Sequence, residues 1–401
     1  MMKKVGIVGI GTTQFRSRWI EKTYFELAFD AVKMALEDAG IEKDRIDCVV
    51  YGIYNDFFER QFQPDLFVHD YIGMAPKPAI RVSTGGATGG SAISVGFTQV
   101  ASGLYDVCLV VGVEKSADCF DYETGKSSPE VLKAISYTAD MTYEQPTGRT
   151  AAGSFALTTI AHLEKYGNPT ELQMAKVSVK NHNNAMLNPV AQSPIPLTID
   201  DVMNSPLIAY PFKRYDNCLY SEGSAVLILA SEEVAGTFRK PPVWIKGIGA
   251  ALDWAIIGNR KDLYSFESSR IAAKKAYSMA GIKKPMEEID LAELHDAFTG
   301  TELIAYEDCF FCNEGEGGRL IDEGIVEREG ILPVNVSGGL IGCGHAVGAT
   351  GIMQTNEIVM HLRDEAGKRQ IKNARVGLVQ SIGGPGAAWT VVLILERDEH
   401  G

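Results

Sequence analysis

The chain repeats itself at a distance of about half its length. The passage A-L-E-D-A-G-I-E-K-D-R-I-D, from Ala35, is matched in order and spacing by A-Y-S-M-A-G-I-K-K-P-M-E-E-I-D, from Ala276, apart from a small insertion. The two ends also agree, since E-G-S-A-V-L-I-L-A-S-E-E (Glu222–Glu233) resembles G-A-A-W-T-V-V-L-I-L-E-R-D-E (Gly386–Glu399). Self-similarity at so long a spacing implies two copies of one α/β unit and excludes a short-period solenoid.

Each copy alternates strands and helices. We place the boundary near residues 236–242, which gives an N-terminal half of residues 1–236 and a C-terminal half of residues 237–401. Residues 118–211 have no counterpart in the second half and are predicted to be an inserted loop region that shapes a substrate pocket. The pattern predicts strands at Val5–Gly11, Arg45–Ile53 and Ile289–Leu294, and helices at Tyr24–Ala39, Ser268–Ala280 and Ile352–Arg363.

Composition excludes several classes of partner. The chain has 401 residues, 45% of them apolar, and a formal charge of −13 with dispersed acidic residues, so it offers no basic face to nucleic acid and little attraction to an anionic membrane. No apolar run approaches a bilayer span or a signal core, and seven scattered cysteines are unlike a secreted disulfide framework, so we expect a cytoplasmic protein with reduced thiols. Cys309 and Cys312 form one C-x-x-C without further ligands, and we expect no metal site.

A glycine-dense stretch near the C-terminus contains one cysteine and one histidine. It reads N-V-S-G-G-L-I-G-C-G-H-A-V-G-A-T-G, from Asn335 to Gly351, and contains Cys343 and His345. Glycine allows close approach of the backbone to a ligand, so this density beside Cys and His indicates a reaction site. The alternative is a tight turn with a buried thiol, because free cysteine is among the most buried residue types.

These motifs carry a family resemblance. The chain resembles the thiolase superfamily over nearly its whole length, particularly the sterol-carrier-protein-type and archaeal thiolases. The resemblance rests on the duplication, the glycine-dense stretch, E-L-H-D-A-F from Glu293, Q-S-I-G-G-P-G from Gln380, and G-E-G-G-R-L-I-D-E-G from Gly315. It implies a duplicated thiolase fold with five layers, αβαβα, a homodimeric core and a CoA thioester as substrate.

The resemblance assigns roles to several residues. Chemistry at the carbon next to a thioester needs donors that hold the carbonyl oxygen while charge develops on it. His295 matches the motif histidine that helps to bind this oxygen, and His345 matches the one that activates the nucleophile and forms a further oxyanion site. Asn335 is expected to support both, and Gly383 and Gly384 are expected to contribute to the oxyanion or CoA-binding site.

The first half departs from the family pattern. Members read approximately R-V-E-S-A-C-A-S-G-G where this chain has R-V-S-T-G-G-A-T-G-G, so the nucleophilic cysteine falls on Gly86, which cannot form an acyl-enzyme. The helix that follows still directs its amides at the site, so Gly86 remains an expected oxyanion position. The family's other cysteine, in C-x-G or H-D-C-F, is also absent, because this chain has S-I-G and Ala297 there.

Cys343 is the obvious substitute, as a nucleophile or as an acid/base, and a packed thiol is the alternative. Two routes need no covalent intermediate: direct attack by CoA on a β-ketoacyl-CoA, or retro-aldol cleavage. Thiolase-like proteins that use the second route lose the motif histidines, so retention of His295 and His345 favours thiolase-like acyl chemistry.

We therefore expect a thiolase-like acyltransferase that cleaves or forms a carbon–carbon bond in a CoA thioester, by β-ketoacyl-CoA thiolysis or its reverse. An acyl-CoA retro-aldolase and a non-catalytic acyl-CoA-binding subunit are the alternatives. CoA is expected as substrate, with no covalently bound cofactor, and the resemblance implies a small accessory subunit with a zinc ribbon and an OB fold. Six aromatic residues are candidates to line a pocket for a bulky or aromatic acyl group, core packing being the alternative: Tyr54, Phe57, Phe58, Phe62, Phe67 and Tyr71.

Overall fold

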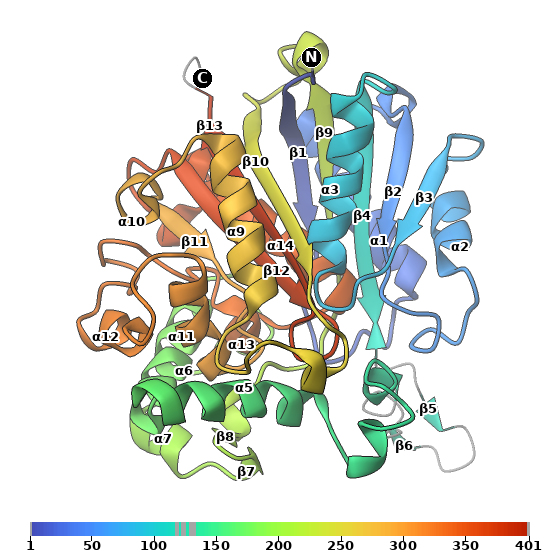
Figure 1. The fold of residues 1–401 in the computed structure, drawn as a ribbon. Helices are drawn as coiled ribbons and strands as arrows, with labels where there is room; N and C mark the ends of the chain where they lie inside the picture. The colour runs from blue at the N-terminus through green and yellow to red at the C-terminus, as the bar shows by residue number, and fades with distance from the viewer. Residues whose placement is uncertain (1, 117–119, 122–125, 128–133, 399–401) are drawn as a thin grey trace.

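Nine strands form one mixed sheet. The computed structural model describes residues 2–116, 120–121, 126–127 and 134–398 (Figure 1). The strands follow the order β11-β12-β13-β10-β1-β9-β4-β2-β3 across the sheet. They are β1 (Val5–Thr12), β2 (Cys48–Gly52), β3 (Ala79–Val82), β4 (Val107–Lys115), β9 (Glu222–Ser231), β10 (Val243–Leu252), β11 (Leu291–Glu293), β12 (Val376–Gly383) and β13 (Trp389–Arg397).

Helices cover the outer faces of the sheet, and two of them pack between the strands of its two halves. They are α1 (Tyr24–Ala39), α2 (Pro64–Tyr71), α3 (Thr88–Ala101), α5 (Ala151–Tyr166), α6 (Glu171–Ala185), α7 (Ile199–Met203), α8 (Glu232–Ala235), α9 (Glu267–Ala280), α10 (Pro285–Glu288), α11 (Thr299–Asp308), α12 (Gly317–Asp322), α13 (Gly339–Cys343) and α14 (Val347–Leu362). Two short hairpins lie outside the sheet, β5 (Phe120–Asp121) with β6 (Lys126–Ser127), and β7 (Leu207–Ala209) with β8 (Phe212–Lys213).

The strand order repeats between the two halves. Neighbours β1, β9, β4 and β2 pair antiparallel, antiparallel and then parallel, and β10, β13, β12 and β11 pair in the same sequence. The irregularities repeat too, because the register shifts between Ile7 and Gly9 in one copy and between Ile245 and Gly247 in the other. The duplicated α/β architecture expected from the sequence is therefore confirmed.

Glycines let one helix in each half approach its strand closely. A Cβ added to Gly11 on β1 would stand 2.2 Å from the carbonyl oxygen of Ala31 on α1. A Cβ added to Gly249 on β10 would stand 1.8 Å from the carbonyl oxygen of Ala272 on α9. No side chain fits at either distance, so the glycines of these two strands set the spacing of the outer helices.

Helices α3 and α14 form the middle layer. They pack against each other, and each contacts strands of both halves, α3 touching β2, β4 and β12 and α14 touching β4, β9 and β12. Helix α1 covers the outer face of the first half and α9 that of the second. Three separate apolar cores fill the spaces between these layers. The order is outer helices, the sheet strands of the first half, the central helices, the sheet strands of the second half, and outer helices, which confirms the five-layer fold.

The predicted element ends agree closely in one case and differ in another. Helix α1 has the predicted ends, because Thr23 and Glu26 form a capping box and Gly40 adopts a left-handed conformation (φ 70°). Helix α14 starts at Val347, five residues before the predicted start at Ile352. One of its early glycines, Gly351, allows a close crossing with α3, because a Cβ added there would stand 2.6 Å from the backbone nitrogen of Gly90.

Residues 134–221, between β4 and β9, include α5, α6, α7 and the β7–β8 hairpin, which lie together at the end of the sheet away from the two chain termini (Figure 1). Among the described residues, no helix combines the length and the apolar character needed to cross a bilayer.

Candidate active site

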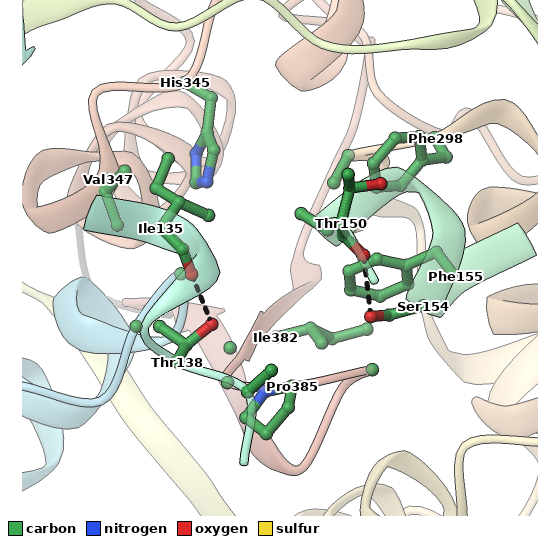
Figure 2. Close-up of a pocket in the computed structure, with 18 of the residues that line it drawn as sticks. Ile135, Thr138, Thr150, Ser154, Phe155, Phe298, His345, Val347, Ile382 and Pro385 are labelled. Atoms are coloured by element: carbon green, nitrogen blue, oxygen red, sulfur yellow. Dashed lines mark hydrogen bonds between the residues drawn. The ribbon is translucent and has the colours of Figure 1, made fainter. Parts of the chain in front are cut away.

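A pocket of about 110 Å³ lies where α3, α5 and α14 begin. Six candidate site residues from the sequence line it together: Tyr54, Gly86, His295, His345, Gly383 and Gly384. Figure 2 shows the ring of His345 directed into this space, with the start of α5 on the facing wall. The structure therefore brings together four motifs that are far apart in the chain.

The pocket lies where equivalent positions of the two copies converge. Tyr54 comes two residues after β2, and His295 comes two residues after β11, its counterpart. Gly86 comes two residues before α3, and His345 comes two residues before α14. Both pairs line the pocket, and the positive ends of both central helices are directed at it, which favours a negative charge there.

The two histidines face each other. Their ring centroids are 5.1 Å apart and their planes are nearly perpendicular, at 87°. Their residues are only 3% and 8% exposed. Burial, together with the nearby His345, lowers the pKa of His295 well below its usual value, and burial lowers the pKa of His345 to about 4. Both rings are therefore neutral at pH 7.

A hydrogen bond assigns the tautomer of His345. Its Nδ1 lies 2.8 Å from Oγ1 of Thr350, whose hydroxyl donates to the carbonyl oxygen of Ala346 at 3.1 Å. A hydroxyl has one proton to donate, so Thr350 accepts from Nδ1–H. This leaves Nε2 of His345 as an unprotonated acceptor that can take a proton from a ligand.

Asp296 connects the two histidine motifs. Its carboxylate accepts hydrogen bonds from the backbone N–H groups of Leu340, at 2.6 Å, and Ile341, at 3.3 Å, in the first turn of α13. It also accepts from Nδ2 of Asn181 at 2.7 Å. Asp296 follows His295 directly, and α13 leads into His345. The carboxylate therefore fixes the position of one motif against the other.

Asn335 supports His295 without lining the pocket. The residue is fully buried and has a positive φ of 55°. Its Oδ1 accepts from the backbone N–H of Leu294 at 2.7 Å, and its Nδ2 donates to Glu302 at 2.7 Å. Asn335 thus holds the chain directly before His295.

Gly86 has neither a side chain nor space for one. A Cβ at this position would stand 2.4 Å from the carbonyl oxygen of Ile382 and 3.0 Å from Nε2 of His295. The loop that contains Gly86 also packs against Gly383, since a Cβ added to Gly383 would stand 2.1 Å from the carbonyl oxygen of Thr84. The backbone at Gly86 can face a bound oxyanion at the start of α3, but this position cannot hold an acyl group.

Cys343 lies apart from the histidines, contrary to its expected role in the site. It is fully buried in the central apolar core, where Nδ2 of Asn188 approaches its Sγ at 3.7 Å and Sδ of Met353 lies 3.9 Å away. Burial raises the pKa of this thiol well above its usual value. The reversal occurs at Gly344 (φ 112°), where the chain turns between Cys343 and His345. The thiol is packed in the core, which matches the alternative of a packed thiol that the sequence left open.

The structure adds residues that the sequence analysis missed. Cys218 and Tyr220 line the pocket, although both precede β9 in a segment without a recognisable motif. The backbone N–H of Cys218 donates to the carbonyl oxygen of Ala297 at 2.9 Å, and Tyr220 forms a β-bridge with His345. Burial, with nearby Asp296, raises the pKa of Cys218 to about 12, so the sulfur stays protonated. These long-range pairings leave no local signal in the sequence.

Most of the aromatic candidates do not line the pocket. Tyr54 does so, whereas Phe58 is fully buried in a small core with Val347. The other four are substantially exposed, at 60%, 80%, 47% and 47% for Phe57, Phe62, Phe67 and Tyr71. The pocket wall is apolar for another reason, since it contains Ile135, Phe155, Phe298 and Ile382.

No metal centre emerges among the residues that the structure describes, where no three His, Cys, Asp or Glu side chains are grouped to hold an ion. Cys309 is fully buried, and burial raises the pKa of its thiol well above the usual value.

Comparison with known proteins gives matches to both halves. The family model described as Thiolase, N-terminal domain matches residues 5–209, and the one described as Thiolase C-terminal domain-like matches residues 249–397. The chain is 36% identical to an acetyl-CoA acetyltransferase of Methanothermobacter thermautotrophicus, over 97% of this chain and 99% of that protein. It is 32% identical to sterol carrier protein 2 of Bos taurus, over 96% of this chain and 71% of that protein.

A solved structure described as an Ltp2-ChsH2(DUF35) aldolase is also similar. It superposes with a TM-score of 0.83 at 26% identity and covers 99% of this chain and 98% of the matched chain.

Proposed function

The chain belongs to the thiolase family, and we propose that it is an acyltransferase that forms or cleaves a carbon–carbon bond next to the carbonyl of a CoA thioester. The observation that carries this proposal is the pair of neutral histidines, 5.1 Å apart, in one pocket at which the two central helices begin. The similarity to an acetyl-CoA acetyltransferase over almost the full length supports it.

In the cleavage direction, the substrate is a β-ketoacyl-CoA and the second substrate is CoA. Nε2 of His345 accepts the thiol proton of CoA, and the sulfur attacks the β-carbonyl carbon directly, because Gly86 supplies no nucleophile. The carbon–carbon bond then breaks, and its electron pair forms the enolate of the shorter thioester. His295 and the backbone at Gly86 stabilise the oxyanion, and the proton returns from His345 to carbon.

Retro-aldol cleavage of a β-hydroxyacyl-CoA is the second candidate. Gly86 favours it, because this reaction needs no acyl-enzyme and only one CoA chain in the pocket. His345 would take the hydroxyl proton, and bond cleavage would release an aldehyde or ketone and form the same enolate, whose carbon would then take the proton back from His345. The similarity to a structure described as an aldolase supports this candidate.

We also make proposals for the protein's partners and its compartment. We propose a homodimer, because β3 lies at the edge of the sheet with Ile80 46% exposed, and an unpaired strand edge is a ready surface for association. We also propose an accessory subunit with a zinc ribbon and an OB fold, since the similar aldolase structure is described with a DUF35 component. The free cysteines of the described chain are typical of a reducing compartment, and we propose the cytoplasm.

The test is a panel of substrates. The protein, with and without any co-purifying partner, is incubated with β-ketoacyl-CoA esters plus CoA and, separately, with β-hydroxyacyl-CoA esters alone, and products are identified by mass spectrometry. Two shorter thioesters in the first set support acyl transfer. An aldehyde or ketone in the second set supports the aldolase. Binding of acyl-CoA without turnover in either set would make the protein a binding subunit.

A further inference from the structure

One arginine in the pocket wall has a buried donor nitrogen without an acceptor among the described residues. Arg149 lines the pocket directly before α5, and its side chain is only 7% exposed. Its Nε donates to Oγ of Ser154 at 2.6 Å, and its Nη1 pairs with Glu144. Its Nη2 is buried and has no hydrogen-bond partner among the described residues. A buried guanidinium nitrogen without an acceptor is destabilising, so this group is set up to receive one from a ligand.

A neighbouring arginine shows what a purely structural guanidinium looks like here. Arg260 is 3% exposed, and all three of its nitrogens donate to backbone carbonyl oxygens. These oxygens belong to Trp254, Gly386 and Pro385, so Arg260 holds the loop that follows β12. Arg149 differs because only two of its three nitrogens have an acceptor among the described residues.

The location of Arg149 relative to the histidines defines a ligand shape. Its neighbours Thr150 and Ser154 lie on the wall of the pocket that faces His345 and Val347 (Figure 2). The space between the two walls is apolar, because Phe155 lines it on the side of Thr150 and Ile135 lines it on the side of His345. A ligand that reacts at the histidines and extends to Arg149 therefore has an apolar middle and an acceptor at its far end.

The charges on this wall select the kind of acceptor. Arg149 pairs with Glu144, and Arg260 has Asp253 at 3.6 Å, so each cation already has one carboxylate. The wall thus offers strong donors but little net positive charge. A single carboxylate, which a guanidinium N–H group recognises well, fits this better than the multiply charged phosphates of CoA.

We propose that the acyl group of the substrate ends in a carboxylate and that Nη2 of Arg149 binds it, so that the enzyme acts on CoA esters of dicarboxylic acids. This rests on the proposed function, which makes a CoA thioester the substrate. Arg149 is then the residue that determines acyl-chain specificity, at the opposite wall from the reacting carbon.

Binding measurements test this without requiring turnover. Calorimetry compares succinyl-, glutaryl- and adipyl-CoA with butyryl-, valeryl- and hexanoyl-CoA, pairs that match in chain length and differ in the terminal carboxylate. The proteins are the wild type, Arg149→Lys, which keeps a charge beside Glu144, and the double variant Arg149→Gln/Glu144→Gln, which removes both charges. Arg319→Lys, on α12 and half exposed outside the pocket, is the matched control.

We expect the wild type and Arg319→Lys to bind the best-fitting dicarboxylic ester about 10 to 100 times more tightly than its monocarboxylic match, the usual range for a hydrogen bond to a charged group. In both Arg149 variants this ratio falls close to one, while CoA itself binds within about threefold of the wild type. Circular dichroism and melting temperature establish that each variant is folded.

Three results overturn the inference. The wild type shows no preference for the carboxylate; or the Arg149 variants lose affinity for CoA as strongly as for the esters, which assigns the arginine to a CoA phosphate; or no CoA ester binds, in which case the proposed function fails as well. Failure of the proposed function alone looks different, with the preference for the carboxylate intact and no carbon–carbon bond cleavage.

Discussion

Replacing Gly86 with alanine tests whether the nucleophile position is closed. The added Cβ would stand 2.4 Å from the carbonyl oxygen of Ile382, where ordinary contact needs about 3.4 Å, so the loop must move by about 1.0 Å (3.4 − 2.4). His295, at 3.0 Å, must also shift. Overpacking of this kind costs about 1 to 3 kcal/mol of stability, and a displacement of about 1 Å at a reacting group costs about 100-fold in rate.

The assay compares melting temperature and kcat/KM of Gly86→Ala with those of the wild type and of Gly236→Ala. Gly236 has no atom within 4 Å of an added Cβ and an ordinary φ of −71°, so its alanine variant is expected to be at least as stable as the wild type. Wild-type stability and activity in Gly86→Ala would refute the argument. So would an acyl adduct on the introduced thiol of Gly86→Cys, because it would show that a side chain fits there.

Three further predictions follow from the site. Alanine in place of His295 or His345 lowers kcat by about 100- to 1000-fold and leaves the Kd for acyl-CoA within a few fold, since each ring contributes to the transition state; equal losses in kcat and in binding would contradict this. Cys343→Ala keeps turnover within a few fold and lowers the melting temperature, because the thiol is packed in the core; loss of activity together with loss of a trapped thioester would instead make it the nucleophile. Below pH 6.5 the unfolded His345 binds a proton, whereas the folded one does not until about pH 4. The free energy of unfolding therefore decreases as the pH is lowered from 6.5 to 4, by about 3 kcal/mol in total. Urea unfolding at pH 7 and 4.5 should show a smaller fall in His345→Gln, and an unchanged fall would count against a buried neutral ring.

The fold could be predicted from the sequence because its determinants are local and occur twice. A capping box at Thr23 and a left-handed glycine at Gly40 mark the ends of α1, and the glycines of β1 and β10 recur at matching places. Apolar periodicity was enough to order the strands and helices between them. The glycine-dense stretch was harder, because glycines that pack against α3 look like helix breakers, and α14 starts earlier than Ile352 as a result.

Only part of the site could be predicted from the sequence. Motifs located His295 and His345, but the turn at Gly344 decides that His345 and not Cys343 reaches the pocket, and a turn angle is not written in residue types. Cys218 and Arg149 come from segments without motifs and enter the pocket only through long-range packing. Their roles depend on which partners remain unused, which only a three-dimensional structure shows.

The convergence of Tyr54 with His295, and of Gly86 with His345, has an evolutionary meaning. Once the ancestral unit was duplicated, each of these positions existed in two versions within one chain, and each version was free to diverge while its twin preserved the scaffold. The bare backbone at Gly86 and the imidazole at His345 occupy the same position of the repeated unit, two residues before α3 and α14 respectively. New chemistry in such a chain arises when equivalent positions of the two copies come to hold different residues. Each pocket residue is therefore best compared with the equivalent residue in the other half of the same molecule.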